Sequence, residues 1–250
     1  MMTPRQNPYT EQSLLMLQQH IEQQTGYAWY AMMDHLMQPA LVQKLGKHAA
    51  HLVNLYGDAS PLELAASPVL LPLPVAGETR NPLLALLLQA CNGLPMLSFW
   101  ASPLPVSQLV QHFARYQDVC LQPDSTIMVL RYADTRIQPS LLRQLTPAQR
   151  NEWLAPFTHM LAFDAHAEMH VVTGSQQARQ GEGKLSLSPE QWGSMIDDAL
   201  PDFLFDDIAS RMPPTLPADL YADIQRRLAE ARRAGCQDEA AIIAYCLQHD

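Results

Sequence analysis

The segment YAWYAMMD, residues 27–34, places the strongest constraint on the fold. In an extended chain, successive side chains point to opposite faces of a sheet. Here aromatic, aliphatic and methionine side chains fill both alternating sets, and the first charged residue is Asp34 at the end. A strand with this pattern is covered on both faces. The sequence therefore predicts a sheet that lies between two layers.

Further apolar segments alternate with helical ones up to about residue 175. Predicted strands follow at 67–75, where prolines favour an edge or bulged strand, at 95–102, at 125–134, and as a hairpin over 159–163 and 169–174. Helices are predicted at 13–24, 39–56, 81–93 with Asn81 as N-cap, 105–116, 139–145 and 146–157. Strands alternating with helices predict an α/β fold with a layered mixed sheet flanked by helices.

The pattern changes after residue 175. Residues 176–187 are polar and contain glycine, which is typical of a linker, and Ser188 with Gln191 has the spacing of a capping box. Apolar residues at helical spacing then continue to the end of the chain, with Gly235 as a break. We therefore predict an α/β domain over 1–175, a linker over 176–187 and a small all-helical lobe over 188–250.

Composition excludes several classes of protein. Of the 250 residues, 48% are apolar and 16% are charged, and the net charge of −9 argues against binding of nucleic acid. The most apolar run, residues 82–100, is interrupted by polar residues, glycine and proline, so we expect no membrane span. A polar N-terminus without a signal-peptide core and four scattered cysteines predict a cytoplasmic protein.

Three charged residues stand where the predicted strand 125–134 ends: Arg131, Asp134 and Arg136. Such positions hold ligand sites in many α/β proteins. A guanidinium also fits a carboxylate through two hydrogen bonds, so Arg131 could bind Asp134, or Asp34 at the end of a neighbouring strand. The sequence shows no catalytic companion for these residues. We therefore favour a structural clasp formed by Asp34, Arg131, Asp134 and Arg136, with an interface as the other interpretation.

A second polar group is the alternating set Asp164, His166, Glu168 and His170. On one strand these side chains would share a face, and imidazole with carboxylate can bind a metal. This arrangement supports an alternative function, metal-assisted hydrolysis. An exposed strand face gives the same alternation without any metal. We expect no metal and no cofactor, and we predict that the protein is not an enzyme.

Several short motifs together resemble those of a known family. They are Y-A-x-x-D at Tyr30, Ala31 and Asp34, a second strand with proline between apolar residues, R-Y-x-D-x-R at residues 131–136, the helical LLRQLTPAQR and a helical C-terminus. In this order they resemble the type VI secretion system effector adaptors, bacterial chaperones similar to the domain-of-unknown-function proteins encoded beside the VgrG spike. One departure is Thr135, where the family usually has proline.

The resemblance implies a function in protein binding. Such adaptors bind a cognate toxic effector in the producing cell and load it onto the VgrG spike. An immunity protein that neutralises a toxin is a further alternative, since it would also be small, acidic and cytosolic. For the partner-binding surface we expect the helical lobe, with Trp192, Phe203, Leu204 and Phe205 as contact residues and the stretch 202–208 exposed beside its aspartates. The alternative is that the lobe completes the core of one fused domain.

Overall fold

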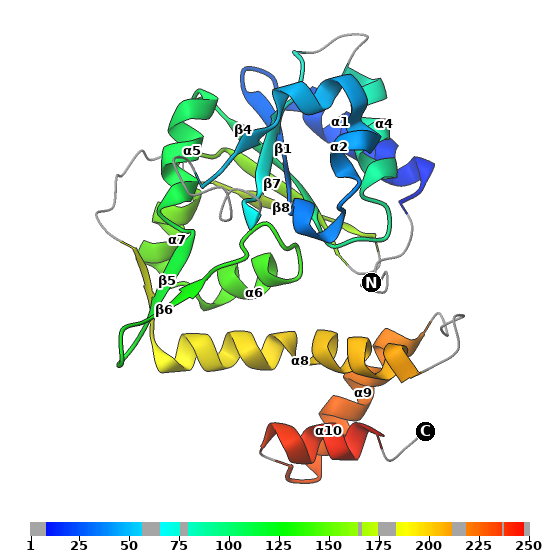
Figure 1. Ribbon diagram of the computed structural model, residues 1–250, viewed down its shortest axis with the longest axis vertical. Helices are drawn as coiled ribbons and strands as arrows, with labels where there is room; N and C mark the ends of the chain where they lie inside the picture. The colour runs from blue at the N-terminus through cyan, green and yellow to red at the C-terminus, as the bar shows by residue number, and fades with distance from the viewer. Residues whose placement is uncertain are drawn as a thin grey trace.

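A six-stranded sheet between two helical layers forms the centre of the molecule (Figure 1). The computed structural model describes residues 9–56, 66–75, 80–164, 167–174, 184–211, 219–236 and 238–247. The strand order is β2-β3-β1-β4-β7-β8, and every neighbouring pair is antiparallel. The bounds are Val53–Asn54 for β2, Val69–Pro72 for β3, Ala28–Met33 for β1, Leu97–Ser102 for β4, His159–Phe163 for β7 and Met169–Thr173 for β8.

The central strands are buried on both faces, as the segment 27–34 predicts. Trp29, Ala31 and Met33 of β1 point into one apolar cluster, which we call the first core. Tyr30 and Met32 point into a second cluster on the opposite face, the second core. All six residues of β4 are buried. The sheet therefore presents no water-facing side at its centre, and each face needs its own helical cover.

Different helices cover the two faces. The first core packs under α1 (Glu11–Gln23), η1 (His35–Met37), α2 (Leu41–Leu45), η2 (Gly46–His51) and α4 (Arg80–Ala90). The second core packs under α5 (Val106–Ala114), α6 (Ile137–Gln144) and α7 (Pro147–Leu154). The two helical layers lie on opposite sides of the sheet in Figure 1. The predicted α/β layered fold is confirmed.

Trp100 of β4 lies at the centre of the second core. Its ring centroid is 4.5 Å from that of Phe157 and 5.6 Å from that of Phe113. The nearby His112 is buried, and its Nε2 lies 3.0 Å from the carbonyl oxygen of Trp153. Burial lowers the pKa of His112 to about 4, because desolvation penalises the imidazolium. This histidine is thus a buried neutral residue of the core.

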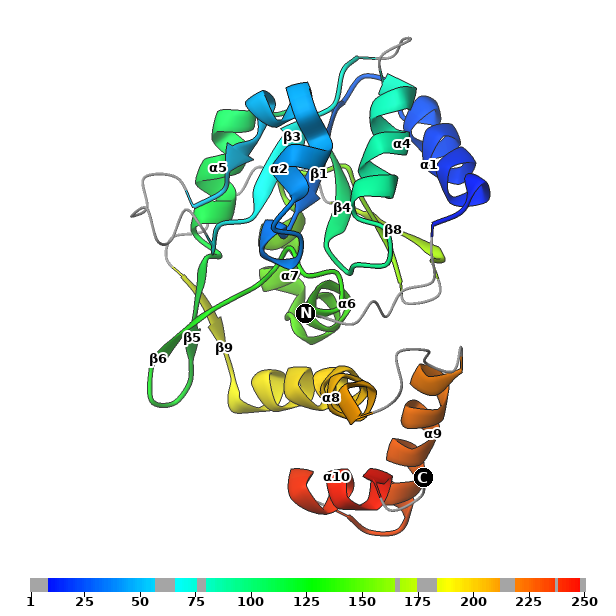
Figure 2. The ribbon, with the colours of Figure 1, turned by 45° about the vertical axis from the view of Figure 1, so that its right-hand side comes forward.

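A smaller sheet of three strands extends from the second core, in the order β6-β5-β9 (Figure 2). Its strands are β5 (Asp118–Leu121), β6 (Thr126–Val129) and β9 (Leu185–Leu187). β5 pairs antiparallel with β6 and parallel with β9, so the mixed pairing of the fold is found here. All four residues of β6 are exposed. The strand predicted at 125–134 is therefore present only over residues 126–129, and our expectation that it is buried is wrong.

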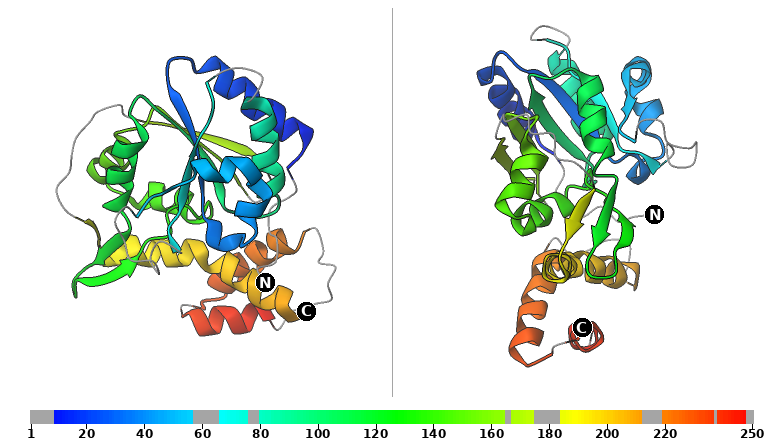
Figure 3. Two further views of the ribbon diagram at one scale, coloured as in Figure 1. Left: turned by 45° about the horizontal axis from the view of Figure 1, so that its top comes forward. Right: turned by 90° about the vertical axis from the view of Figure 1, so that its left-hand side faces the viewer.

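The C-terminal region is helical, as predicted. It consists of α8 (Pro189–Arg211), α9 (Leu220–Arg233) and α10 (Glu239–Leu247). Figure 3 shows α8 end-on beneath the α/β part, with α9 and α10 farther from it. A third core joins the second half of α8 to α9 and α10. Within the predicted linker, residues 185–187 form β9 and therefore belong to a sheet; residues 176–183 lie outside the described residues.

Three local predictions need correction. The predicted helix 39–56 ends early, because Gly46 adopts φ +53° and a 3-10 turn follows α2. Asn81 lies inside α4, which begins at Arg80, and is not its N-cap. β3 is next to the edge, because β2 covers two of its residues. The predicted capping box of Ser188 and Gln191 is present, with both reciprocal hydrogen bonds.

Among the described residues, every helix is too short or too polar to serve as a membrane span. All four cysteines, Cys91, Cys120, Cys236 and Cys246, are free thiols. The three cores and the polar contacts between their elements stabilise the fold.

Gly174, just after β8, offers a test of packing. A methyl group added at its Cα would lie 1.9 Å from the carbonyl oxygen of Phe157, so backbone would have to move. We expect Gly174→Ala to lower the free energy of unfolding by about 1–3 kcal/mol, measured by urea denaturation. Gly193→Ala is the matched control, because Gly193 has open space and lies within α8. It should raise stability by about 0.5–1 kcal/mol; equal effects of both substitutions would contradict a close approach of the backbone at Gly174.

Because His112 is buried in its neutral form, we predict that the free energy of unfolding falls at acidic pH. Its pKa is about 4 in the folded state and about 6.5 in the unfolded chain, so below about pH 6.5 the unfolded state binds a proton that the folded state does not. This group alone should therefore remove about 3 kcal/mol of stability as the pH falls from about 7 to 4. We expect His112→Gln to lose clearly less stability over that range in urea denaturation. An identical loss in parent and variant would exclude His112 as the cause.

Candidate functional site

The first candidate site is the end of the main sheet where Asp34 meets Arg131. Asp34 follows β1, and its backbone N–H donates to the carbonyl oxygen of Met96, 3.0 Å away, next to β4. Arg131 follows β6 and donates from Nη2 and Nε to Asp34 Oδ2, at 2.6 and 3.2 Å. The carboxylate side chain is 4% exposed and the arginine side chain 39%. This ion pair links the region after β6 to the end of β1.

Asp134 and Arg136 form a second pair in the same loop. Arg136 donates from Nε to Oδ1 at 2.8 Å and from Nη2 to Oδ2 at 2.5 Å. The backbone N–H of Arg136 also donates to Asp134 Oδ1 at 3.0 Å, so Asp134 stabilises the turn that starts α6. Of the two predicted partners of Arg131, the structure selects Asp34, while Asp134 binds Arg136.

The loop 131–136 is anchored on its inner side by Tyr132. This ring is fully buried and stacks on Phe113 with a centroid distance of 5.3 Å. The carbonyl oxygen of Tyr132 accepts from Gln138 Nε2 at 2.9 Å, and Gln138 also contacts Ser98 Oγ at 3.2 Å. Burial, together with nearby Tyr56 and Asp34, raises the pKa of the Tyr132 phenol. The motif R-Y-x-D-x-R therefore fastens one loop to the second core through Tyr132 and to the end of β1 through Arg131.

The acidic and histidine set of 164–170 lies on a hairpin and not along one strand. Asp164 follows β7, whereas His170 belongs to β8, and their side chains meet with Oδ2 and Nε2 2.7 Å apart. The backbone N–H of Glu168 donates to Asp164 Oδ1 at 3.0 Å. His166 lies outside the described residues. The hairpin predicted over 159–163 and 169–174 is confirmed, so Asp164 and His170 do not share one strand. Among the described residues no group of three or more ligating side chains forms a metal site.

The predicted partner-binding residues of α8 differ in exposure. Leu204 and Phe205 are buried in the third core, so the prediction that all three consecutive residues stay exposed is wrong for these two. Phe203 is 61% exposed. Trp192 is half-buried against the second core. Consecutive helical residues are separated by about 100° around the axis, which explains why one points outward while its neighbours pack on α9.

Polar contacts fix the first half of α8 on the α/β part. Asp198 accepts from Ser140 Oγ at 2.6 Å and from Arg143 Nη2 at 2.8 Å, both on α6. Gln191 Nε2 donates to the carbonyl oxygen of Gln144 at 2.6 Å. The serine and arginine contacts lower the pKa of Asp198 against an opposing effect of desolvation, the largest single influence on it. These contacts fix α8 relative to α6, and they thereby define where the exposed residues of α8 lie.

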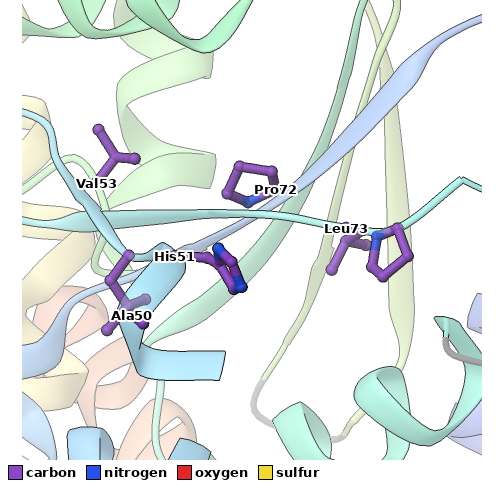
Figure 4. Close-up of a pocket in the computed structure, with 7 residues that line it drawn as sticks. Ala50, His51, Val53, Pro72 and Leu73 are labelled. Atoms are coloured by element: carbon purple, nitrogen blue, oxygen red, sulfur yellow. The ribbon is translucent and has the colours of Figure 1, made fainter. Parts of the chain in front are cut away.

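Sequence reasoning missed a groove beside β2 and β3. It has a volume of about 480 Å³ and is lined by residues 50–53 and 72–74, several of them drawn in Figure 4. β2 pairs only with Val69 and Leu70 of β3, so the groove lies where β3 continues beyond its neighbour. Prolines at 72 and 74 lack an N–H and the walls are mainly apolar. The segment 67–75 carried the signal, since its prolines indicate a strand near an edge.

The ion pair of Arg131 and Asp34 predicts a stability effect. Arg131→Met removes the charge and leaves Asp34 buried without its guanidinium, so we expect a loss of about 1–3 kcal/mol in urea denaturation. With Asp34→Asn, a double-mutant cycle should give a coupling energy of about 0.5–3 kcal/mol. Arg143→Met is the control, because its pair with Asp198 is far more exposed and is worth about 1 kcal/mol or less.

A different result would assign Arg131 another role. If Arg131→Met is as stable as the parent but loses binding to a partner protein, the pair belongs to an interface and not to a clasp.

Comparison with known proteins gives a family match. Residues 29–152 match a family model described as Domain of unknown function (DUF4123). No curated protein and no solved structure matches the chain significantly. The match runs from β1 to α7 and includes both ion pairs and the loop 131–136. The part of the chain that contains these ion pairs is therefore similar to the DUF4123 family.

Proposed function

We propose that this protein is an adaptor of a bacterial type VI secretion system. It binds a cognate toxic effector in the cytoplasm of the producing cell and loads it onto the VgrG spike. The observation that carries this proposal is the match of residues 29–152 to DUF4123, a family associated with type VI secretion adaptors. The order of the motifs at residues 30–34 and 131–136 supports the same assignment.

The matched residues and helix α8 suit different roles in an adaptor. Asp34, Arg131, Asp134 and Arg136 are used in pairs that hold loops and strand ends together. Residues with this role suit the common scaffold of a family. Recognition of one particular effector needs a surface that differs between adaptors, and α8 lies beyond the matched residues.

An apolar stripe on α8 suits recognition of a partner. Ile196 and Phe203 are both exposed and seven residues apart, so they lie on the same side of the helix, and Trp192 continues the stripe by one turn. α8 carries six acidic residues and one arginine. An aromatic anchor among carboxylates fits a partner segment that combines apolar and basic side chains. We propose the stripe Trp192, Ile196 and Phe203 as the effector-binding surface.

The proposal includes a non-catalytic role without cofactor. The two carboxylates at the sheet end are each paired with a guanidinium, and the buried His112 donates or accepts within the core. Stoichiometric zinc or manganese that survives dialysis of the purified protein would instead support the metal-assisted hydrolase. Neutralisation of a toxin in a growth assay, without binding to VgrG, would support the immunity protein.

The stripe predicts the effect of one substitution. We expect Phe203→Asp to weaken co-purification with the cognate effector by at least about tenfold, because it adds a charge to an already acidic surface. Circular dichroism should stay unchanged, since Phe203 is exposed. Val75→Asp is the matched control: Val75 is exposed and follows β3, a strand that lies far from α8 in Figure 2.

Other outcomes would redirect or overturn the proposal. Undiminished effector binding by Phe203→Asp would exclude the stripe as the recognition surface. Failure of the parent protein to bind the cognate effector and VgrG, tested separately and together, would overturn the adaptor function itself.

A further inference from the structure

Strand β6 is an open edge of the smaller sheet. Within the described part of the chain it pairs with β5 and has no neighbour on its other side. Its central side chains are apolar and exposed, with Ile127 at 50% and Val129 at 61%. Proteins usually protect such edges with lysine, proline, a bulge or a covering segment. The sequence of β6, TIMV, contains no charged residue and no proline.

The pairing with β5 shows which backbone groups of β6 are available. The N–H of Leu130 donates to the carbonyl oxygen of Gln117 at 2.9 Å, so these two residues form a hydrogen-bonded pair. In antiparallel strands, hydrogen-bonded and non-hydrogen-bonded pairs alternate. Met128, opposite Val119, therefore points its backbone groups toward β5. The N–H and C=O groups of Ile127 and Val129 point away from β5, toward the open edge.

We propose that β6 binds an extended segment of a partner protein by strand addition. The segment would pair with the backbone of Ile127 and Val129 and extend the sheet from three strands to four. Apolar side chains of the segment would lie beside Ile127 and Val129 on one face and beside Met128 on the other. This site goes beyond the proposed secretion role and does not depend on it.

The local charges define the chemistry of the segment. The exposed side chains of Ile127, Met128 and Val129 are apolar, and Asp118, opposite Val129 on β5, is paired with Lys184 at 2.5 Å. An apolar segment therefore fits this edge. It differs in this respect from the basic segment that suits the acidic helix α8.

A second copy of this chain does not fit as the occupant. A strand of four residues spans roughly 13 Å, and pairing of two β6 strands alone would bury far less than the about 1,200 Å² of a stable interface. Each copy also carries a net charge of −9, which opposes association. A flexible segment of another protein does not carry this net charge, and residues on either side of its paired stretch can add contacts beyond β6. β6 projects from the molecule in Figure 2 and leaves room for such a segment.

The direction of the backbone groups allows a sharp test. Val129→Pro removes the outward N–H but leaves the bonds to β5, and proline is tolerated on edge strands where its nitrogen faces solvent. Val129→Thr keeps the N–H and the shape but makes the side chain more polar. The probe is a library of random peptides displayed on phage, selected on the full-length parent protein. Selected peptides are then synthesised, and their Kd values are measured by fluorescence polarisation.

Strand addition predicts a particular ranking. Selected peptides should bind Val129→Pro at least about tenfold more weakly than the parent and Val129→Thr within about threefold. If peptides bind through side chains alone, the proline variant keeps its affinity and the threonine variant loses it, which would overturn the proposal. Absence of any selected apolar peptide would overturn it too. Ile127→Pro is the second variant, because its N–H points the same way, in case Val129→Pro lowers the melting temperature.

Amide hydrogen exchange gives a readout that does not depend on substitutions. In the free protein, the amides of Ile127 and Val129 should exchange at least about tenfold faster than those of Met128 and Leu130. Saturation with a selected peptide should slow Ile127 and Val129 by about tenfold or more while the other two change little. Equal exchange of all four amides in the free protein would contradict the assigned backbone directions.

Discussion

The fold depends on the burial of the central strands from both sides. β1 and β4 place apolar side chains on each face of the sheet, so neither strand is stable until two helical layers have packed on it. Burial of apolar surface stabilises the folded state by about 25 cal/mol per Å². Both cores contain side chains of the same strands, β1 and β4. Loss of either layer would expose half of the side chains of β1 and β4. The two layers are therefore expected to form cooperatively.

Charged residues are used where this sandwich ends. The chain passes from β6 to α6 through the loop 131–136, and an apolar contact alone would not fix its direction there. Arg131 ties the loop to Asp34 at the end of β1, Tyr132 inserts into the second core, and Asp134 starts α6. A buried carboxylate is costly unless it is paired, so each pairing specifies one arrangement of the loop. Although the chain has few charged residues, these ones determine how the loop 131–136 is arranged relative to the sheet.

The structural role of these charged residues can be predicted from the sequence, because it depends only on their position next to an apolar segment. A charge that directly follows an apolar strand lies at a sheet end, whatever the order of the strands. The choice of Asp34 over Asp134 as the partner of Arg131 brings together residues 97 positions apart in the chain, which no local pattern specifies. The exposure of β6 is hidden for the same reason, since STIMVL has the composition of a buried strand. Leu204 and Phe205 are buried because α9 packs on their side of α8, a fact of tertiary structure.

The two proposed surfaces, the edge of β6 and the stripe on α8, would recognise different features of a partner. A sheet edge recognises backbone, so it accepts many sequences that can extend, and β6 lies within the residues that match the family. A stripe on a helix recognises side chains, and α8 lies outside the matched residues. β9 connects them, because it belongs to the sheet of β6 and leads directly into α8. One partner that contacts both surfaces would gain affinity from the second contact, since the first holds it at a high local concentration. Tolerant pairing on β6 would thus be combined with selective contacts on α8, and the connection through β9 would set the distance that the partner has to span.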